Sequence, residues 1–324
     1  MYNDEELDSA VAAQVLSAQS ADAFRAFVAE RRHTTIKDEE SFRLLTGFND
    51  IFVVIAIGLL LVSLGGLGGT LAAGAGALLV AVAAWLLAEY FTRQRRMALP
   101  SIVLLLAFVG GVFGATLAAL EGSDPAPIFA SAASALAAWV HWQRFRVPIT
   151  VAAGAAAVVA IGVSTLLSAI PGGEHWLLPL MFCAGLLVFG YALRWDLSDR
   201  DRRTRRSDVA FWLHLLAAPL LVHPVFGAMQ RLDDHALAQT LLVLGVYVAL
   251  GVVSLAINRR ALMVSALSYV LFAFTALLRE SGVVSLSFTL TALVIGSALL
   301  LLSAFWHPCR AAVLQWLPSA RRLG

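Results

Sequence analysis

Charged side chains are scarce in this chain, and lysine is almost missing. Charged residues make up 14% of the 324 positions, against about a quarter in a soluble domain, while 60% of the residues are hydrophobic. Lys37 is the only lysine among 23 basic residues. This composition excludes a soluble globular protein and a disordered one. The formal net charge is +2 and the basic residues lie in short clusters between apolar runs, so we expect no nucleic acid partner.

Cysteine and the usual motifs of enzymes are also lacking. The two cysteines, Cys183 and Cys309, cannot form a disulfide framework. The sequence has no GxSxG, HExxH or CxxC pattern, and no GK[ST] follows its glycine runs. We therefore expect no cofactor and no metal site, and these absences weigh against an enzyme.

Long apolar runs are what the chain has instead. About 20 mostly apolar residues cross the hydrocarbon layer as a helix. Ten such segments predict an all-α, polytopic transmembrane helix bundle over residues 47–306; the fourth and ninth are the weakest, which leaves nine spans as an alternative. The segments are Phe48 to Leu64, Thr70 to Tyr90, Leu99 to Leu120, Ile128 to Trp142, Pro148 to Ile170, Trp176 to Leu193, Val209 to Phe226, Leu237 to Ile257, Ala261 to Leu278 and Val283 to Phe305.

The arginines predict the orientation of these spans, because basic residues accumulate in cytoplasmic loops. With the N-terminus inside, 21 of the 23 basic residues fall on the cytoplasmic side, and only Arg231 and Arg279 fall outside. The bias towards Arg, Ala and Leu is typical of a GC-rich bacterial genome. The start MYNDEELDSA is acidic and precedes no apolar core, so we expect no cleavable signal peptide. We expect a multi-pass protein of the bacterial cytoplasmic (inner) membrane, with lipid as its surroundings and both termini cytoplasmic.

Residues 1–46 have a different character and predict a short cytoplasmic region of three amphipathic helices. The first covers Leu7 to Leu16, Ser17 caps the second, which runs to Arg32, and Thr35 caps the third. Fewer than about 40 residues rarely hold a core alone, so these helices must pack on each other, on the membrane or on a protein partner. The tail, residues 307–324, is predicted to be a cytoplasmic interfacial segment.

One N-terminal stretch carries a family resemblance. In LDSAVAAQVLSAQSADAFRAFV a short helix ends at Val15-Leu16-Ser17, and Gln19 precedes a second helix. This pattern resembles the cytoplasmic N-terminal region of bacterial multi-spanning membrane proteins of the DUF2157 type. The resemblance covers roughly residues 5–30 and the many spans that follow, and it implies no active site.

The seventh predicted span, SDVAFWLHLLAAPLLVHPVF, holds the candidate intramembrane polar site. Pro219 has no N–H for the carbonyl of Leu215, so we expect a kink about one turn above His214. His214 and His223 are nine positions apart and face opposite directions at about 100° per residue, so they are not a metal pair. Two interpretations stay open: His214, the kink and the Leu215 carbonyl line a polar path, or each histidine makes one interhelical hydrogen bond.

Two acidic residues mark membrane boundaries. We expect Asp208, after Ser207, to be a helix cap and dipole partner, and Glu89 to pair with Arg93 at i+4. Gly110-x-x-x-Gly114 predicts a close helix contact. By the predicted boundaries no span contains a central ionisable residue, which weighs against a charge-coupled transporter.

Three functional classes remain. The first is a transporter or permease-like protein for an uncharged or lipid-like small molecule, with the seventh span along its path. The alternative is a membrane-embedded sensor or scaffold that engages a partner through residues 1–46. A membrane enzyme acting on lipid through His214 and Asp208 is the third.

Overall fold

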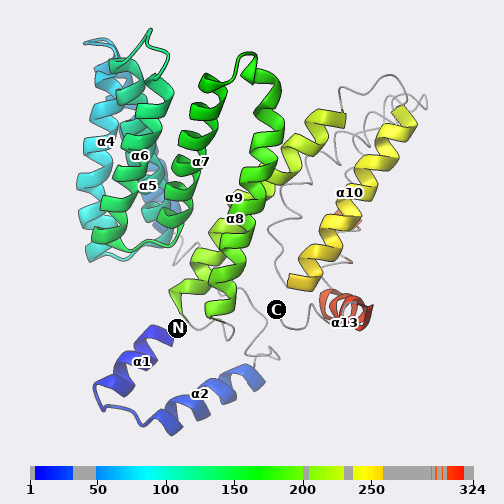
Figure 1. The fold of residues 1–324 in the computed structure, drawn as a ribbon. Helices are drawn as coiled ribbons and strands as arrows, with labels where there is room; N and C mark the ends of the chain where they lie inside the picture. Colours follow the sequence, from blue (N-terminus) through cyan, green and yellow to red (C-terminus); the bar gives the residue numbers. More distant parts are fainter. Residues whose placement is uncertain are drawn as a thin grey trace.

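The computed structural model of the chain describes residues 4–31, 49–199, 204–229, 236–257 and 305–316, with four further residues between 293 and 301. Every regular element in these ranges is a helix, so the all-α class is confirmed for them (Figure 1). The helices are α1 (Asp4–Ala12), α2 (Ala18–Arg31), α3 (Asn49–Gly69), α4 (Ala75–Ala88), the π-helix η1 (Glu89–Gln94), α5 (Ala98–Ala119), α6 (Ala126–Phe145), α7 (Ile149–Ala169), the 3-10 turn η2 (Gly173–Trp176), α8 (Leu177–Ser198), α9 (Arg205–Met229), α10 (Ala236–Ile257) and α13 (Trp306–Trp316).

Six of the described helices are long and apolar enough to cross a membrane: α3, α4 with η1, α5, α7, α8 and α9. The predicted fourth and eighth segments coincide with α6 and α10, which are not among the six. The predicted ninth segment lies outside the described residues, and so does all but a few positions of the tenth. The structure therefore supports a membrane protein with six candidate spans, and the count of ten stays a prediction.

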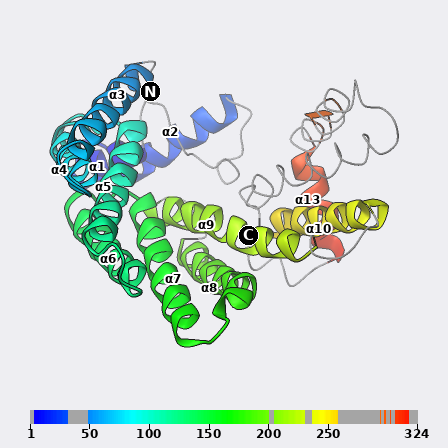
Figure 2. The same ribbon diagram turned by 90° about the horizontal axis from the view of Figure 1, so that it is seen from above.

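The bundle is a curved row of helices in two packed groups. Figure 2 shows α3 to α6 as one group and α7 and α8 continuing its curve, with α9 on the inner side. Apolar side chains of α3, α4 and α5 form one core, and those of α7, α8 and α9 form another. Trp212 of α9 packs against the second core and also against a smaller cluster of Ile102, Leu105 and Ile149. This indole therefore joins the two groups.

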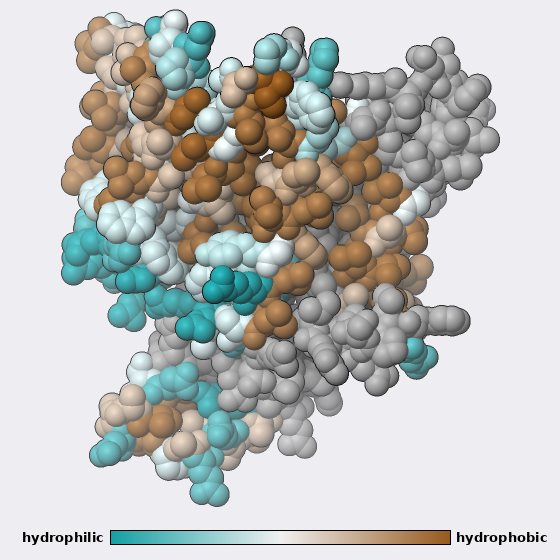
Figure 3. Space-filling model, viewed as in Figure 1, coloured by the Kyte–Doolittle hydropathy of each residue, from teal (hydrophilic) through white to brown (hydrophobic). Residues whose placement is uncertain are grey.

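The outside of the bundle is apolar, as a hydrocarbon environment requires. Val62 of α3 and Leu187 of α8 are each 76% exposed, which would be costly in water. Figure 3 shows apolar side chains over the sides of the helices and hydrophilic ones gathered at the lower end. That end carries the α4–α5, α6–α7 and α8–α9 connections, and we call it the arginine-rich end. Figure 1 shows α1 and α2 on this same side.

The N-terminal helices differ from prediction at one boundary. The first was expected to reach Leu16 but ends earlier, because the chain turns at Gln14, where φ is 58°. The cap of α2 is confirmed: the hydroxyl of Ser17 accepts a hydrogen bond from the backbone N–H of Ser20 at 3.0 Å. The third predicted helix lies outside the described residues.

The predicted spans Phe48 to Leu64 and Thr70 to Tyr90 leave the glycine run at residues 65–69 as the connection between the first two helices, and this prediction is wrong. The run is the last part of α3, and the turn follows it at residues 70–74. A Cβ added at Gly76 of α4 would lie 2.2 Å from the carbonyl oxygen of Gly65. The glycines therefore let α3 and α4 approach each other closely, which no larger side chain would permit.

Of the two glycines predicted to make a close contact of α5, Gly114 faces α4 and Gly110 does not. Gly110 has open space around its Cβ position, whereas a Cβ on neighbouring Gly111 would lie 2.7 Å from the carbonyl oxygen of Ala77 and 2.9 Å from the amide nitrogen of Ala81. A Cβ added at Gly114 would lie 3.3 Å from the Cβ of Ala77. The α4–α5 interface is thus formed by Gly111 and Gly114.

These neighbouring glycines give a matched test of the interface. We expect Gly111→Ala to destabilise the bundle by about 1–3 kcal/mol, because the added methyl group meets backbone atoms that cannot move aside. Gly110→Ala, one residue away, should leave stability unchanged or slightly higher. Thermal unfolding in detergent, followed by tryptophan fluorescence, measures both. Equal effects of the two substitutions would contradict the assigned interface.

Candidate functional site

A buried contact between two ionisable side chains joins α8 to α9. Nε2 of His214 lies 2.7 Å from Oδ2 of Asp196. The His214 side chain is fully buried, and 8% of the Asp196 side chain is exposed. An ionised carboxylate only accepts hydrogen bonds, so Nε2 is the donor in that state. Asp196 thus holds the imidazole in one orientation.

Apolar groups surround the rest of the imidazole. The ring of Phe189 meets it nearly edge-on at a centroid distance of 5.3 Å, and Leu213 and Ala217 of the same helix belong to the apolar core. Nδ1 of His214 is buried and has no hydrogen-bond partner among the described residues. A buried polar atom costs free energy unless a hydrogen-bond partner satisfies it.

The α8–α9 connection holds these two residues in register. Oδ2 of Asp199, just beyond α8, accepts hydrogen bonds from the backbone N–H of Thr204 at 2.9 Å and from its hydroxyl at 2.7 Å. α9 begins at the next residue. Further along, a Cβ at Gly185 of α8 would lie 3.0 Å from Leu220 and Leu221 of α9, so the two helices approach closely there as well.

The four residues predicted for the intramembrane site are not brought together. His214 is buried and Leu215 is half-buried, while Pro219 and His223 are exposed. The prediction that the two histidines face opposite directions is confirmed. α9 runs through both of its prolines to Met229, beyond the predicted end of the span at Phe226, so His223 lies within the helix. Of the two interpretations of His214, the geometry matches the interhelical hydrogen bond.

Of the predictions for the two boundary acids, the one that made Asp208 a helix cap is wrong and the one for Glu89 is confirmed. α9 begins at Arg205, earlier than predicted, so Asp208 lies within its first turn and is not a cap. A carboxylate there still interacts favourably with the helix dipole. The pair of Glu89 with Arg93 is confirmed at 3.4 Å, and Glu89 also accepts two hydrogen bonds from Arg144 of α6, at 2.7 and 3.0 Å. This fork ties the end of α4 to the end of α6.

A second buried imidazole was missed. His141 of α6 is fully buried, and its Nδ1 lies 3.2 Å from the hydroxyl of Thr150 at the start of α7. The rings of Phe145 and Trp85 stand 4.6 and 6.2 Å from it, centroid to centroid. Nε2 of His141 has no partner among the described residues. The sequence indicates this buried position only by placing a histidine within an apolar segment.

Asp196 was missed because the sixth span was expected to end at Leu193. α8 continues to Ser198, and the buried face of its second half is Gly185, Val188, Ala192 and Asp196. The predicted end of the span at Leu193 is therefore wrong, and the helix carries a buried acid in its last turn, away from the centre of the span. This acid joins α8 to α9 through its bond to the imidazole, and we assign it no further chemistry.

Comparison of the chain with family models, with curated proteins and with solved structures finds no match. The resemblance to DUF2157 proteins therefore stays a prediction.

The Asp196–His214 pair predicts a strong coupling between two substitutions. His214→Phe removes a hydrogen-bond donor from a buried carboxylate and should cost about 3–5 kcal/mol of unfolding free energy. Adding Asp196→Leu should recover most of that loss, because both partners are then apolar. His223→Phe is the control, and because its side chain is exposed we expect about 0.5 kcal/mol or less. Unfolding measurements on the single and double variants give the coupling energy. Strictly additive losses would contradict a direct pair.

Proposed function

We propose that this chain is a permease-like protein for an uncharged or lipid-like small molecule, with the path along α9. The observation that carries the proposal is the bond between a carboxylate and an imidazole across two membrane-capable helices. Ionisable groups inside a membrane are costly, and proteins usually retain them along substrate or proton paths.

The polar atoms of α9 support the same idea. Pro219 cannot donate to the carbonyl of Leu215, so this oxygen lacks its helical donor one residue from His214. Nδ1 of His214, which has no partner among the described residues, adds a second polar atom on the same stretch of helix. A solute with a hydroxyl or amide group would satisfy both atoms. His214 is fully buried, so in the proposed cycle this conformation is the closed one.

The proposal includes the cellular setting that the arginines predict. The protein would lie in the bacterial inner membrane with ten spans, both termini inside and the arginine-rich end towards the cytoplasm. The position of α1 and α2 on the side of the arginine-rich end is consistent with this orientation (Figure 1).

Reconstitution in liposomes tests the permease proposal. We expect the protein to speed either the flipping of a fluorescently labelled phosphatidylethanolamine, read by dithionite quenching, or glycerol entry, read by osmotic swelling. His214→Phe should return the rate to that of empty liposomes, because it removes a polar group of the path. His223→Phe should keep the full rate. Rates equal to empty liposomes for the unmodified protein with both probes would remove the support for a permease.

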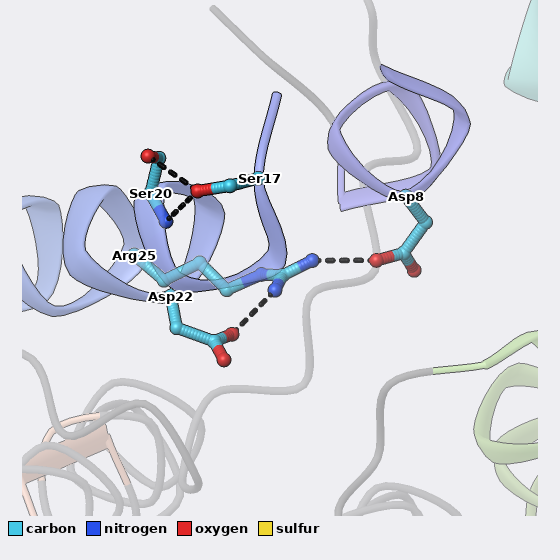
Figure 4. Close-up of polar contacts among 5 residues, drawn as sticks. All are labelled: Asp8, Ser17, Ser20, Asp22 and Arg25. Carbon is cyan, nitrogen blue, oxygen red and sulfur yellow. Dashed lines mark hydrogen bonds and ion pairs between the residues drawn. The ribbon is translucent and has the colours of Figure 1, made fainter. Parts of the chain in front are cut away.

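A second function is favoured by the N-terminal helices. Arg25 of α2 donates to Asp8 of α1 at 2.7 Å and to Asp22 of its own helix at 2.8 Å (Figure 4). Leu7 and Ala21 are buried, although α1 and α2 are short. Residues 4–31 carry six acids and two arginines, a formal net charge of −4. Val15 and Phe27 are exposed by 77% and 55%. We infer that this acidic two-helix unit presents an apolar surface to a protein partner, as a sensor or scaffold would.

The two aspartates that bind Arg25 provide the matched test. A photo-reactive phenylalanine analogue at Phe27 should give one discrete protein adduct in cells. Asp8→Asn should reduce that adduct, because it removes the ion pair between α1 and α2. Asp22→Asn removes only a contact within α2 and should leave the adduct unchanged. No adduct, or equal effects of the two substitutions, would contradict a partner site formed by both helices.

A further inference from the structure

The turns at the ends of α4 and α6 hold a dense and unbalanced positive charge. Residues 89–97 and 142–146 contain five arginines and one acid, Glu89, a formal net charge of +4. All five arginines are exposed. They are Arg93, Arg95, Arg96, Arg144 and Arg146. The ion pair between Arg144 and Glu89, at 2.7 Å, holds the two turns together as one surface, which we call the arginine cluster.

One arginine of the cluster is held by neutral groups. Arg95 donates through Nε and a terminal nitrogen to the hydroxyl of Tyr90, at 3.1 and 2.9 Å, and its guanidinium lies 5.5 Å from the centre of that ring. The π-helix makes this contact possible. Its i→i+5 hydrogen bonding, with the N–H of Arg95 donating to the carbonyl of Tyr90 at 3.0 Å, stacks residues five apart on one face.

A second arginine is held in the same way on the other turn. The guanidinium of Arg146 lies 5.5 Å from the ring centre of Trp142 and donates to the side-chain carbonyl of Gln143 at 3.3 Å. Stacking on an aromatic face lowers the entropy lost when a guanidinium binds a ligand. Neither Arg95, Arg96 nor Arg146 contacts a carboxylate within the part of the chain that the structure describes. Their positive charge is therefore available to an anion.

The position of the cluster indicates which anion. Tyr90 and Trp142 lie at the ends of apolar helices, where amphipathic rings meet the headgroup layer. Basic pockets between membrane helices bind phosphate-bearing headgroups, and guanidinium groups bind phosphate oxygens in a forked geometry. We propose that the arginine cluster is a binding site for the headgroup of an anionic phospholipid, with Arg95 and Arg146 as its two preformed arms. This assignment does not depend on the proposed permease or scaffold function.

The α8–α9 connection supplies an internal contrast. Residues 194–208 carry six arginines but also four aspartates, a formal net charge of +2 over a similar length. Asp199 there is bound to Thr204 and Asp196 to His214, so these acids belong to the folded hairpin. Arg206 is exposed on this segment and serves as a control arginine at the same end of the bundle.

The test measures lipid binding to the full chain in detergent by native mass spectrometry. Phosphatidylglycerol should bind more tightly than phosphatidylcholine. At about 1 kcal/mol per arginine, Arg95→Gln with Arg146→Gln should raise the Kd for phosphatidylglycerol about 10- to 30-fold. Arg206→Gln should change it by less than about twofold. The double lysine variant keeps the charge but loses the stacked fork, and it should show an intermediate loss.

Three results would overturn the assignment. They are equal Kd values for the two lipids, an equal loss in Arg206→Gln, and competition by millimolar inorganic phosphate that abolishes lipid binding, which would indicate a site for the free anion. If the double glutamine variant fails to fold, the comparison of the two lipids on the unmodified protein and the lysine variant still decide the question.

Discussion

Buried polar groups in an apolar bundle must find their hydrogen-bond partners within the chain, and in this molecule that requirement joins neighbouring helices in pairs. Asp196 with His214 joins α8 to α9, and His141 with Thr150 joins α6 to α7. The helix faces around these contacts are largely alanine and leucine, which can slide past one another at little cost. A single hydrogen bond of defined length removes that freedom, because any shift by one turn would leave both partners buried and unpaired. Two polar pairs therefore set the register of four helices.

Hydrogen bonds between helices can form only where small residues let the two helices lie close together. A side chain as short as that of aspartate reaches a neighbouring helix only when the two backbones lie close together. Gly185 lets α9 approach α8, and Gly111 lets α5 approach α4. The Ala-rich faces between them keep the distance short along the whole contact. Between α8 and α9 the glycine and the polar pair thus depend on each other, since Gly185 brings the helices close and the bond of Asp196 to His214 fixes where along the helix they stop.

The sequence predicts where the helices lie, but it does not predict the residues at which they end. A long run of apolar residues marks the part of a helix that can lie in the hydrocarbon layer. Eight of the ten predicted segments accordingly coincide with helices. Helical hydrogen bonding does not stop where hydrophobicity stops, and α8 continues five residues past the predicted end at Leu193. The partner of His214 lies in that extension. The spacing of three and four that links Gly185, Val188, Ala192 and Asp196 could have revealed it, whereas no pattern in the sequence connects His141 to Thr150.

The register of α9 against α8 also decides how deep the site lies. His214 is nine residues from the start of α9, a rise of about 14 Å, but Asp196 is only two residues from the end of α8, about 3 Å. Because the two side chains meet, His214 lies opposite the last turn of α8, and the bonds from Thr204 to Asp199 close the connection at the same end. Arg194 on α8 and Arg205 and Arg206 at the start of α9 are exposed around this end, and such side chains favour the headgroup layer. Packing, and not distance from the charged end, therefore keeps the Asp196 carboxylate from water, since its neighbour Leu197 is exposed while Asp196 is buried. A buried acid so close to a charged connection is held by its bond to the imidazole, and this bond makes α9 the place to look for function.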